Sequence, residues 1–249
     1  MQGRVTTADS MQVSVSAAVV AITAAAAALV LLASLHVLSP EYSPAWRIVS
    51  EYANGHYAWV LSLMFAAYGI SSLALAFAIR SQARTRSCRI GVVLLTISGI
   101  GQVAAAVFDL NQVALHEAAG ALGIICLPIA AMLISRTLVR TPQWSAARRP
   151  ILFAANLTWI SVVLWVGTLV LMVATFLHAF GGVLPTAPPK EVPPGVIALV
   201  GWTNRLLIVS AWAWVSMVAW QGITVRSRVG SADGDIVATR RPAEPGASI

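Results

Sequence analysis

The sequence predicts an all-α integral membrane protein, a bundle of six transmembrane helices with both termini cytoplasmic. The first observation is composition: 58% of the 249 residues are hydrophobic and only 10% are charged, against roughly 25% charged in a typical soluble domain. The second is a series of six apolar stretches, each about long enough for a helix to cross a bilayer. The third is that arginines gather in alternate connections between these stretches.

The first apolar stretch follows a short N-terminal segment, residues 1–12, which is predicted to be cytoplasmic. It is longer than the roughly 7–15 apolar residues of a cleaved signal peptide, so it is interpreted as an uncleaved span. The six predicted spans of the membrane domain, residues 13–225, are residues 13–38, 57–79, 90–108, 116–135, 151–177 and 197–225.

Two of these spans have individual features. The fourth contains Pro128, which predicts a kink. The fifth exceeds the ~20 residues that a perpendicular helix needs, so it should tilt or protrude. Residues 226–249, which follow the sixth span, contain Gly, Ser, Pro and charges of both signs, and are predicted to form a disordered cytoplasmic tail.

The arginines predict the orientation of the spans. The second and fourth connections and the tail carry clusters of them, whereas the other side has only Arg47, Lys190 and Arg205. Basic residues are enriched in cytoplasmic loops, so both termini are predicted to lie inside the cell, and the expected location is the plasma (inner) membrane. The clustered residues, with one that precedes the first span, are Arg4, Arg80, Arg84, Arg86, Arg89, Arg136, Arg140, Arg148, Arg149, Arg226, Arg228, Arg240 and Arg241.

The net charge of +7 does not indicate a nucleic-acid partner. The charges lie in short loops between apolar stretches, where they orient a membrane protein. Cys88 lies in a basic loop and Cys126 lies inside an apolar stretch, so a disulfide between them is not expected. Neither cysteine belongs to a metal-binding or redox motif.

The predicted outer side collects the unusual polar residues. They are His36, Glu41, Glu51, His56, Asp109, His116, Glu117, His178 and Glu191. Asp109 and His116 flank a very short connection, so the ends of the third and fourth spans must be neighbours. Imidazole and carboxylate groups build metal sites and acid–base pairs, which makes these two residues the metal candidates. Arg205 could pair with a carboxylate or with an anionic lipid headgroup.

Polar and small residues also recur inside the spans. Polar side chains follow one face of the third span and one face of the fifth: Ser98, Gln102 and Asp109, then Ser161, Thr168 and Thr175. Because polar groups are costly in lipid, these faces are expected to contact other helices or to line a common water-filled cleft. Close helix contacts are expected at Gly99, Gly101, Gly120 and Gly123.

Simpler interpretations stand beside each of these. A histidine at a membrane interface is stable there without any ligand, because it is half apolar and half hydrated. No HxxxH or HExxH spacing supports a metal site. No GxSxG elbow surrounds Ser50, which would be the nucleophile of a hydrolytic triad with His116 and Asp109. A stripe of Ser and Thr is also typical of helix packing.

Several features resemble one family of membrane proteins. The first outer loop and second span read "HVLSPEYSPAWRIVSEYANGHYAWVLSLMFAAYGISSLALA", with Ser50-Glu51-Tyr52-Ala53 followed by a Tyr-x-Trp start, Phe65 and Gly69. Later come the Asp109…His116 hairpin, Pro128, Asn204-Arg205-Leu206 and Trp212. From about His36 to Trp220, this order is similar to the bacterial and archaeal six-span proteins of domain of unknown function 998. Asn204 stands where the family pattern favours Gln.

The resemblance implies a six-helix fold and an outer-face polar cluster, but it brings no established activity. The expected cluster consists of Ser50, Glu51, Tyr52, Asp109, His116 and Arg205. Secondary binding candidates are His36, His56, Gln102, Glu117 and His178.

Three functions follow from these observations. The favoured one is binding or moving a lipid or small solute through an outer-facing polar cleft, because polar groups are costly inside a membrane and commonly mark a functional site. The second is an accessory subunit, in which the cluster only holds the outer loop over the bundle. The third is an intramembrane hydrolase acting on lipid at the outer leaflet, for which no catalytic signature is present. Expected partners are membrane lipids and either another protein or a second copy, and no cofactor is identified.

Overall fold

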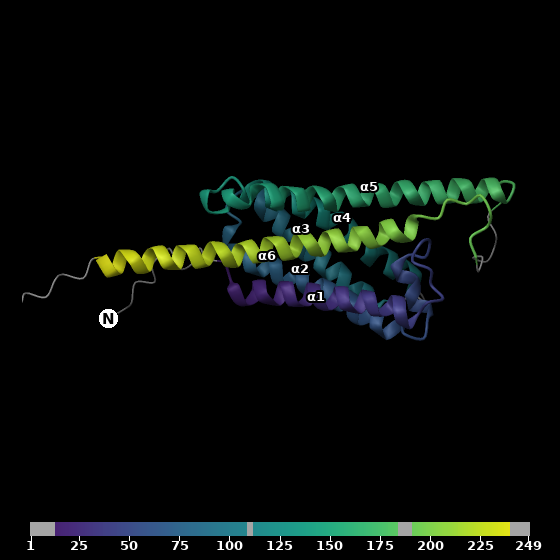
Figure 1. The fold of residues 1–249 in the computed structure, drawn as a ribbon, viewed down its shortest axis with the longest axis horizontal. Coiled ribbons are helices and arrows are strands. Elements are labelled where there is room, and N and C mark those ends of the chain that lie inside the picture. Colours follow the sequence, from purple (N-terminus) through teal and green to yellow (C-terminus); the bar gives the residue numbers. More distant parts are fainter. Residues whose placement is uncertain (1–12, 109–111, 184–190, 240–249) are drawn as a thin grey trace, which may run out of the picture.

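The computed structural model describes residues 13–108, 112–183 and 191–239, and every regular element in these ranges is helical. Six long helices lie side by side along the long axis of the molecule (Figure 1). All six are long and apolar enough to cross a membrane, which confirms the predicted all-α, six-span bundle. They are α1 (Val15–Leu38), α2 (Ala58–Ile79), α3 (Arg86–Val107), α4 (Val113–Leu138), α5 (Arg148–Ala179) and α6 (Val200–Thr239).

Short 3-10 helices occupy three of the connections: η2 (Val49–Asn54), η3 (Arg80–Gln82) and η5 (Pro142–Ala147). Consecutive long helices pack against each other from α1 to α4, and α5 packs against α6. The contacts of α1 with α6 and of α4 with α5 close the ring, and α2 also reaches α6. The bundle therefore has a shared apolar interior in which α2 and α6 meet.

Small residues let neighbouring helices approach closely, as the sequence predicts at three of four glycines. A Cβ added at Gly101 would lie 2.7 Å from the Ala119 carbonyl oxygen, and one at Gly99 would lie 2.8 Å from Leu73 Cγ. A Cβ at Gly123 would lie 3.3 Å from Gln102 Cγ. Gly120 differs, since no atom lies within 4 Å of the corresponding position, so this glycine is not a packing contact.

The fifth helix is the longest continuous apolar element. With 32 residues, it extends about 48 Å at 1.5 Å per residue, more than the ~30 Å of bilayer hydrocarbon. It begins three residues earlier than predicted because Pro150 lies in the first turn, where a missing backbone N–H costs nothing. Beyond the start of α6 it continues alone, so the helix protrudes from the bundle (Figure 1).

The sixth helix differs from its prediction at its C-terminal end. It continues to Thr239, so residues 226–239 are helical where the sequence predicts a disordered tail. The first proline after the span is Pro242, and extending an existing helix costs little once its nucleus has formed. The predicted N-terminal segment, residues 1–12, and residues 240–249 lie outside the described residues.

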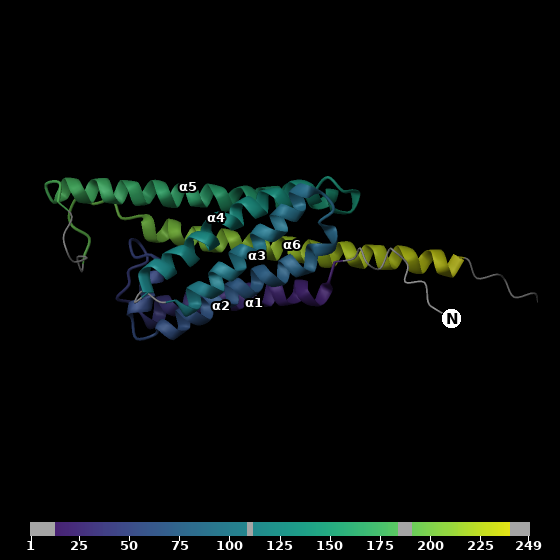
Figure 2. The same cartoon turned by 180° about the vertical axis from the view of Figure 1, so that it is seen from behind.

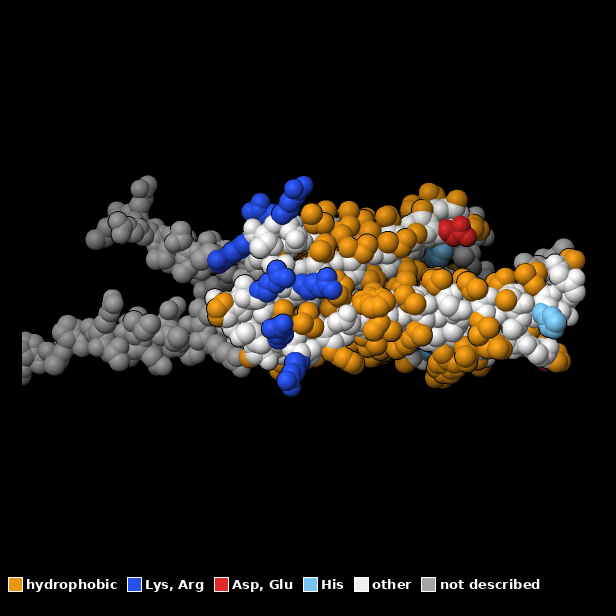
Figure 3. All heavy atoms as spheres, turned by 90° about the horizontal axis from the view of Figure 1, so that it is seen from above, with side chains coloured by type: hydrophobic (Ala, Val, Ile, Leu, Met, Phe, Trp, Pro, Cys, Tyr) orange, Lys and Arg blue, Asp and Glu red, His pale blue; other side chains and the backbone are white. Residues whose placement is uncertain are grey.

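The two ends of the bundle differ in charge. Basic side chains gather at one end of a broad hydrophobic band (Figure 3), here called the Arg-rich end. Its described members are Arg80, Arg84, Arg86, Arg89, Arg136, Arg140, Arg148, Arg149 and Arg226. α1 begins and α6 ends at this end (Figures 1 and 2). The opposite end, called the distal end, is formed by residues 39–57 and the start of α6. That the Arg-rich end is cytoplasmic stays a prediction of the sequence.

Candidate functional site

The centre of the distal end is Arg205, in the second turn of α6, with only 5% of its surface exposed. Its guanidinium group connects α6 with the end of α1 and with the loop between α1 and α2. The acceptors are His36 Nε2 at 2.7 Å, the Tyr52 hydroxyl at 3.1 Å, and the carbonyl oxygens of Arg47 at 2.8 Å, Gly201 at 3.0 Å and Pro44 at 3.4 Å.

The contact with Arg205 determines the protonation of His36. A guanidinium can only donate, so Nε2 of His36 must accept. The proton of the neutral ring is then on Nδ1, which donates to the Leu32 carbonyl oxygen at 2.7 Å. The His36 ring also packs edge-on against fully buried Tyr52, with ring centroids 6.1 Å apart. His36, a secondary candidate in the sequence, is therefore central to the network.

One further side chain, Asn204, holds η2 against α6, and another, Glu51, makes contacts within the loop. Asn204 Oδ1 accepts a hydrogen bond from the Val49 backbone N–H at 2.9 Å, in a buried position. Glu51 pairs with Arg47 at 2.6 Å and accepts from the Ile48 N–H at 3.1 Å. Sequence reasoning missed the role of Asn204, although a polar residue beside an arginine at the start of an apolar span is a usable signal.

Two other loop residues stand near these contacts. Ser50 is half-buried within η2. The ring of Tyr42 lies 5.3 Å from that of Tyr52. Burial, and then the charges of neighbouring carboxylates, raise the pKa of Tyr42, so its hydroxyl stays neutral at physiological pH.

Among the described residues, no acid balances the charge of Arg205. No carboxylate in these ranges lies within ion-pair distance of its guanidinium group, and Glu51 at this end pairs with Arg47 instead. Carbonyl oxygens and neutral rings take the place of a counter-ion. Because five acceptors already surround the guanidinium, an anionic headgroup could bind it only by displacing them. The geometry thus indicates a structural role, in which Arg205 holds α1, the loop and α6 together.

In the ranges that the structure describes, the contacts of His116 do not include any residue of the Arg205 network. It is buried on α4, and its Nδ1 is 2.7 Å from the carbonyl oxygen of Phe108, the residue that ends α3. Its ring is edge-on to that of Phe65 on α2, at 6.3 Å. His116 thus closes the end of α3 onto α4. Asp109, its expected partner, lies outside the described residues.

The remaining outer candidates do not converge with Arg205. His56, Glu117 and His178 are exposed. In the part of the chain that the structure describes, no three His, Cys, Asp or Glu side chains lie close enough to hold a metal ion. The candidate metal pair of Asp109 and His116 therefore stays a prediction.

The polar stripes inside the spans form separate helix contacts rather than one cleft. In α3, Gln102 donates to Ser98 and accepts from Ser72 of α2, both at 3.0 Å, and Ser98 donates to the Gly123 carbonyl oxygen at 3.0 Å. Of the two expected roles, helix contact or a common polar lining, these hydrogen bonds favour helix contact. Polar groups in an apolar interior pair with a neighbouring helix; those of α3 pair with α2 and α4, and those of α5 pair with α6. The α5 contacts are those of Ser161 with Ser210, at 2.9 Å, and Thr168 with Thr203, at 2.6 Å.

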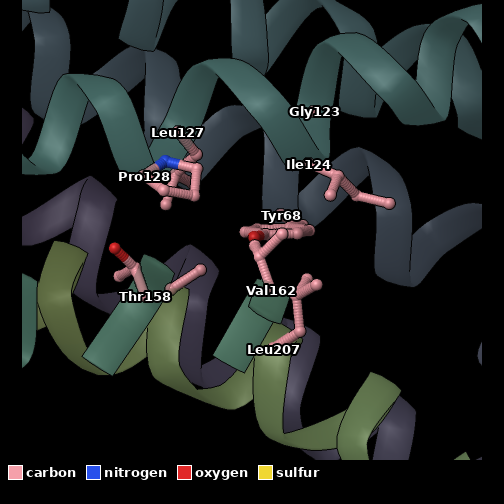
Figure 4. A pocket seen from close by; sticks show the side chains of 9 residues that line it. Tyr68, Gly123, Ile124, Leu127, Pro128, Thr158, Val162 and Leu207 are labelled. Carbon is pink, nitrogen blue, oxygen red and sulfur yellow. The ribbon is translucent and has the colours of Figure 1, made fainter. Parts of the chain in front are cut away.

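A cavity lies near the middle of four helices, α2, α4, α5 and α6 (Figure 4). Its enclosed volume is about 10 Å³, room for roughly one water molecule, so a larger molecule fits only if the surrounding helices move apart. Its lining is apolar except for two hydroxyl groups, and the Thr158 hydroxyl donates to the Ala155 carbonyl oxygen at 2.7 Å. The lining residues are Tyr68, Gly123, Ile124, Leu127, Pro128, Thr158, Val162, Leu207 and Ala211.

The mouth of the cavity lies between α4 and α5. Of the nine lining residues, Ile124 on α4 and Val162 on α5 are partly exposed, and the others are buried. Their neighbours Ile125 and Val163 are each 58% exposed on the lipid-facing surface. α4 runs obliquely, close to α5 at the Arg-rich end and farther from it at the distal end (Figure 2). The sequence does not predict this cavity, because its mostly apolar residues come from four different spans and no local pattern connects them.

Comparison with known proteins finds one family. A family model described as "Protein of unknown function (DUF998)" matches residues 20–221, which is more than half of the chain. No curated protein and no solved structure matches.

Proposed function

The chain belongs to the DUF998 family of proteins of unknown function, and we propose that this multi-pass membrane protein binds a lipid that enters sideways from the bilayer between α4 and α5. The observation that carries the proposal is the cavity near the middle of the bundle. Its partly exposed rim, Ile124 and Val162, belongs to the lipid-facing surface. A molecule already dissolved in the bilayer reaches such a mouth without crossing water.

The lining favours a lipid over a polar solute. None of the nine residues around the cavity is charged, so a charged solute would lose its hydration without compensation. A hydrocarbon chain that enters between α4 and α5 as the mouth widens would keep these apolar side chains in contact with apolar atoms. This supports the lipid ligand expected from the sequence, and it replaces the expected polar route with an apolar one.

The helices around the mouth are suited to opening. In its most apolar stretch only 11% of α5 is buried, against 56% of α6, so α5 has the least packing to lose if it moves. α4 carries Pro128 beside the cavity, and a proline weakens the hydrogen-bond ladder of its helix. Widening the mouth should therefore cost little free energy.

The accessory function is a second candidate for the distal end. Its support is the arrangement around Arg205, in which five acceptors from the end of α1, the loop and α6 surround one guanidinium. This arrangement suits a role in holding residues 39–57 over the bundle, on which a partner protein could dock. The contacts of His116 give no support to the hydrolase function, because its Nδ1 is already within hydrogen-bond distance of the Phe108 carbonyl oxygen.

The proposal predicts that filling the cavity expels the lipid. Val162→Trp should lower the amount of lipid that copurifies with the protein roughly tenfold, because the lipid would have to displace the indole ring from the cavity; about 1.4 kcal/mol of lost binding free energy gives this factor. Native mass spectrometry with lipid analysis of detergent-purified protein measures this loss. Ala211→Leu, which fills the cavity from the buried side, should act in the same direction.

The matched control is Val163→Trp, one position along α5 and 58% exposed to lipid. It should keep both the copurified lipid and the melting temperature of the native protein. Equal lipid content in the Val162 and Val163 variants, with both folded, would contradict the proposal. So would a native protein that takes up no lipid when incubated with bilayer extract.

A further inference from the structure

The cavity is lined by a tyrosine hydroxyl group for which the described residues provide no hydrogen-bond partner. Tyr68 is 6% exposed, lies near the middle of α2 and lines the cavity (Figure 4). Its ring packs edge-on against Trp212, with centroids 5.5 Å apart. Its hydroxyl has no hydrogen-bond partner in the described part of the chain. A buried tyrosine hydroxyl normally has a partner, and leaving it unpaired at mid-membrane depth is costly.

A residue that lines the cavity also carries a backbone acceptor without its helical donor. Pro128 lies inside α4 and has no backbone N–H, so the carbonyl oxygen of Ile124, four residues earlier, lacks its helical donor. Both residues line the cavity. Besides Thr158, which bonds within its own helix, the lining residues thus supply one hydroxyl donor, on α2, and one backbone acceptor that lacks its helical donor, on α4.

We propose that the cavity recognises a hydroxyl group on an otherwise apolar molecule, that is, a lipid alcohol. The ligand oxygen accepts the hydrogen bond of the Tyr68 hydroxyl, and the ligand hydroxyl hydrogen is donated to the Ile124 carbonyl oxygen. An ester or ether oxygen could meet only the first of these groups, and a hydrocarbon neither. This inference rests on the proposed lipid binding and names the class of lipid.

The test compares three competitors of equal chain length: hexadecanol, its methyl ether and hexadecane. Each displaces a diazirine-bearing photoreactive hexadecanol from the purified protein in nanodiscs, and mass spectrometry maps the labelled positions. In the native protein, hexadecanol should compete about tenfold better than hexadecane, with the ether between them, as expected for one or two hydrogen bonds in an apolar site. Tyr68→Phe should remove most of this preference and leave hexadecane competition unchanged.

Tyr42→Phe in the distal loop is the matched control, and should keep the full preference. Saturable labelling of α4 and α5 with equal competition by alcohol and alkane would overturn the hydroxyl recognition while lipid binding stands. The same holds if Tyr68→Phe, folded by its melting temperature, keeps the preference. Absence of saturable labelling there in the native protein would overturn the lipid-binding function and this inference together.

Discussion

Arg205→Met is expected to destabilise the folded protein by about 3–5 kcal/mol, the cost of removing one partner from a buried charged network. Methionine keeps much of the length of the side chain but donates no hydrogen bond. His36 Nε2, the Tyr52 hydroxyl and three carbonyl oxygens would lose their shared donor in a buried position. Lysine should not restore stability, because one ammonium cannot span acceptors arranged around a planar guanidinium.

The change is measured as the melting temperature of detergent-purified protein, followed by tryptophan fluorescence. The control is Arg136→Met on the exposed surface of the Arg-rich end, where a substitution should stay within about 0.5 kcal/mol. If the two variants melt together, the Arg205 network contributes no stability, and its buried cation would instead be held for a ligand.

Gly201→Ala is expected to cost about 3 kcal/mol, at the upper end of overpacking penalties. An added Cβ would lie 2.7 Å from the Arg47 carbonyl oxygen and 2.9 Å from the Ala45 carbonyl carbon, and it would also meet the Pro44 carbonyl oxygen. These are backbone atoms of the loop, and the Gly201 N–H donates to the Ala45 carbonyl oxygen at 3.0 Å. The loop would have to lift away from α6, which would also separate Arg205 from its acceptors.

Gly120→Ala provides the opposite control. No atom lies within 4 Å of its Cβ position, inside helix α4, so alanine should stabilise the protein by roughly 0.5–1 kcal/mol through its higher helix propensity. Comparing the two variants in one melting series separates steric exclusion from the general effect of glycine. A Gly201→Ala protein as stable as Gly120→Ala would mean that the loop does not dock closely on α6.

The two distal variants also separate architecture from ligand binding. Below their melting temperatures, Arg205→Met and Gly201→Ala should keep the copurified lipid, because neither residue lines the cavity. Val162→Trp should have the reverse pattern, with lipid lost and a smaller loss of stability than in those two variants, because Val162 is partly exposed at the mouth and its new side chain meets no fixed backbone atoms of a docked loop. These opposite effects would show that the polar cluster stabilises the fold and that the apolar cavity binds lipid.

The sequence alone was sufficient for the number and approximate limits of the spans and for the gathering of arginines at one end. These are local properties: the length of an apolar stretch decides whether a helix can cross the bilayer, and basic residues between stretches remain in contact with water. The quoted residues between His36 and Trp220 were also sufficient to suggest the family. The helical continuation of α6 was not predicted, because the tail was judged by its composition alone. An existing helix, however, extends at little cost in free energy.

Only the tertiary structure decided which side chains meet. His36 and Arg205 are 169 positions apart, and the histidine predicted to join the arginine, His116, instead caps α3. The cavity combines mostly apolar residues of four helices, and no pattern within one helix predicts that they meet. The physical reason is that a membrane helix is apolar on nearly every side, so its sequence carries little information about its rotation or its neighbours. Partners are determined by packing and by paired polar groups, and these exist only after the helices have assembled.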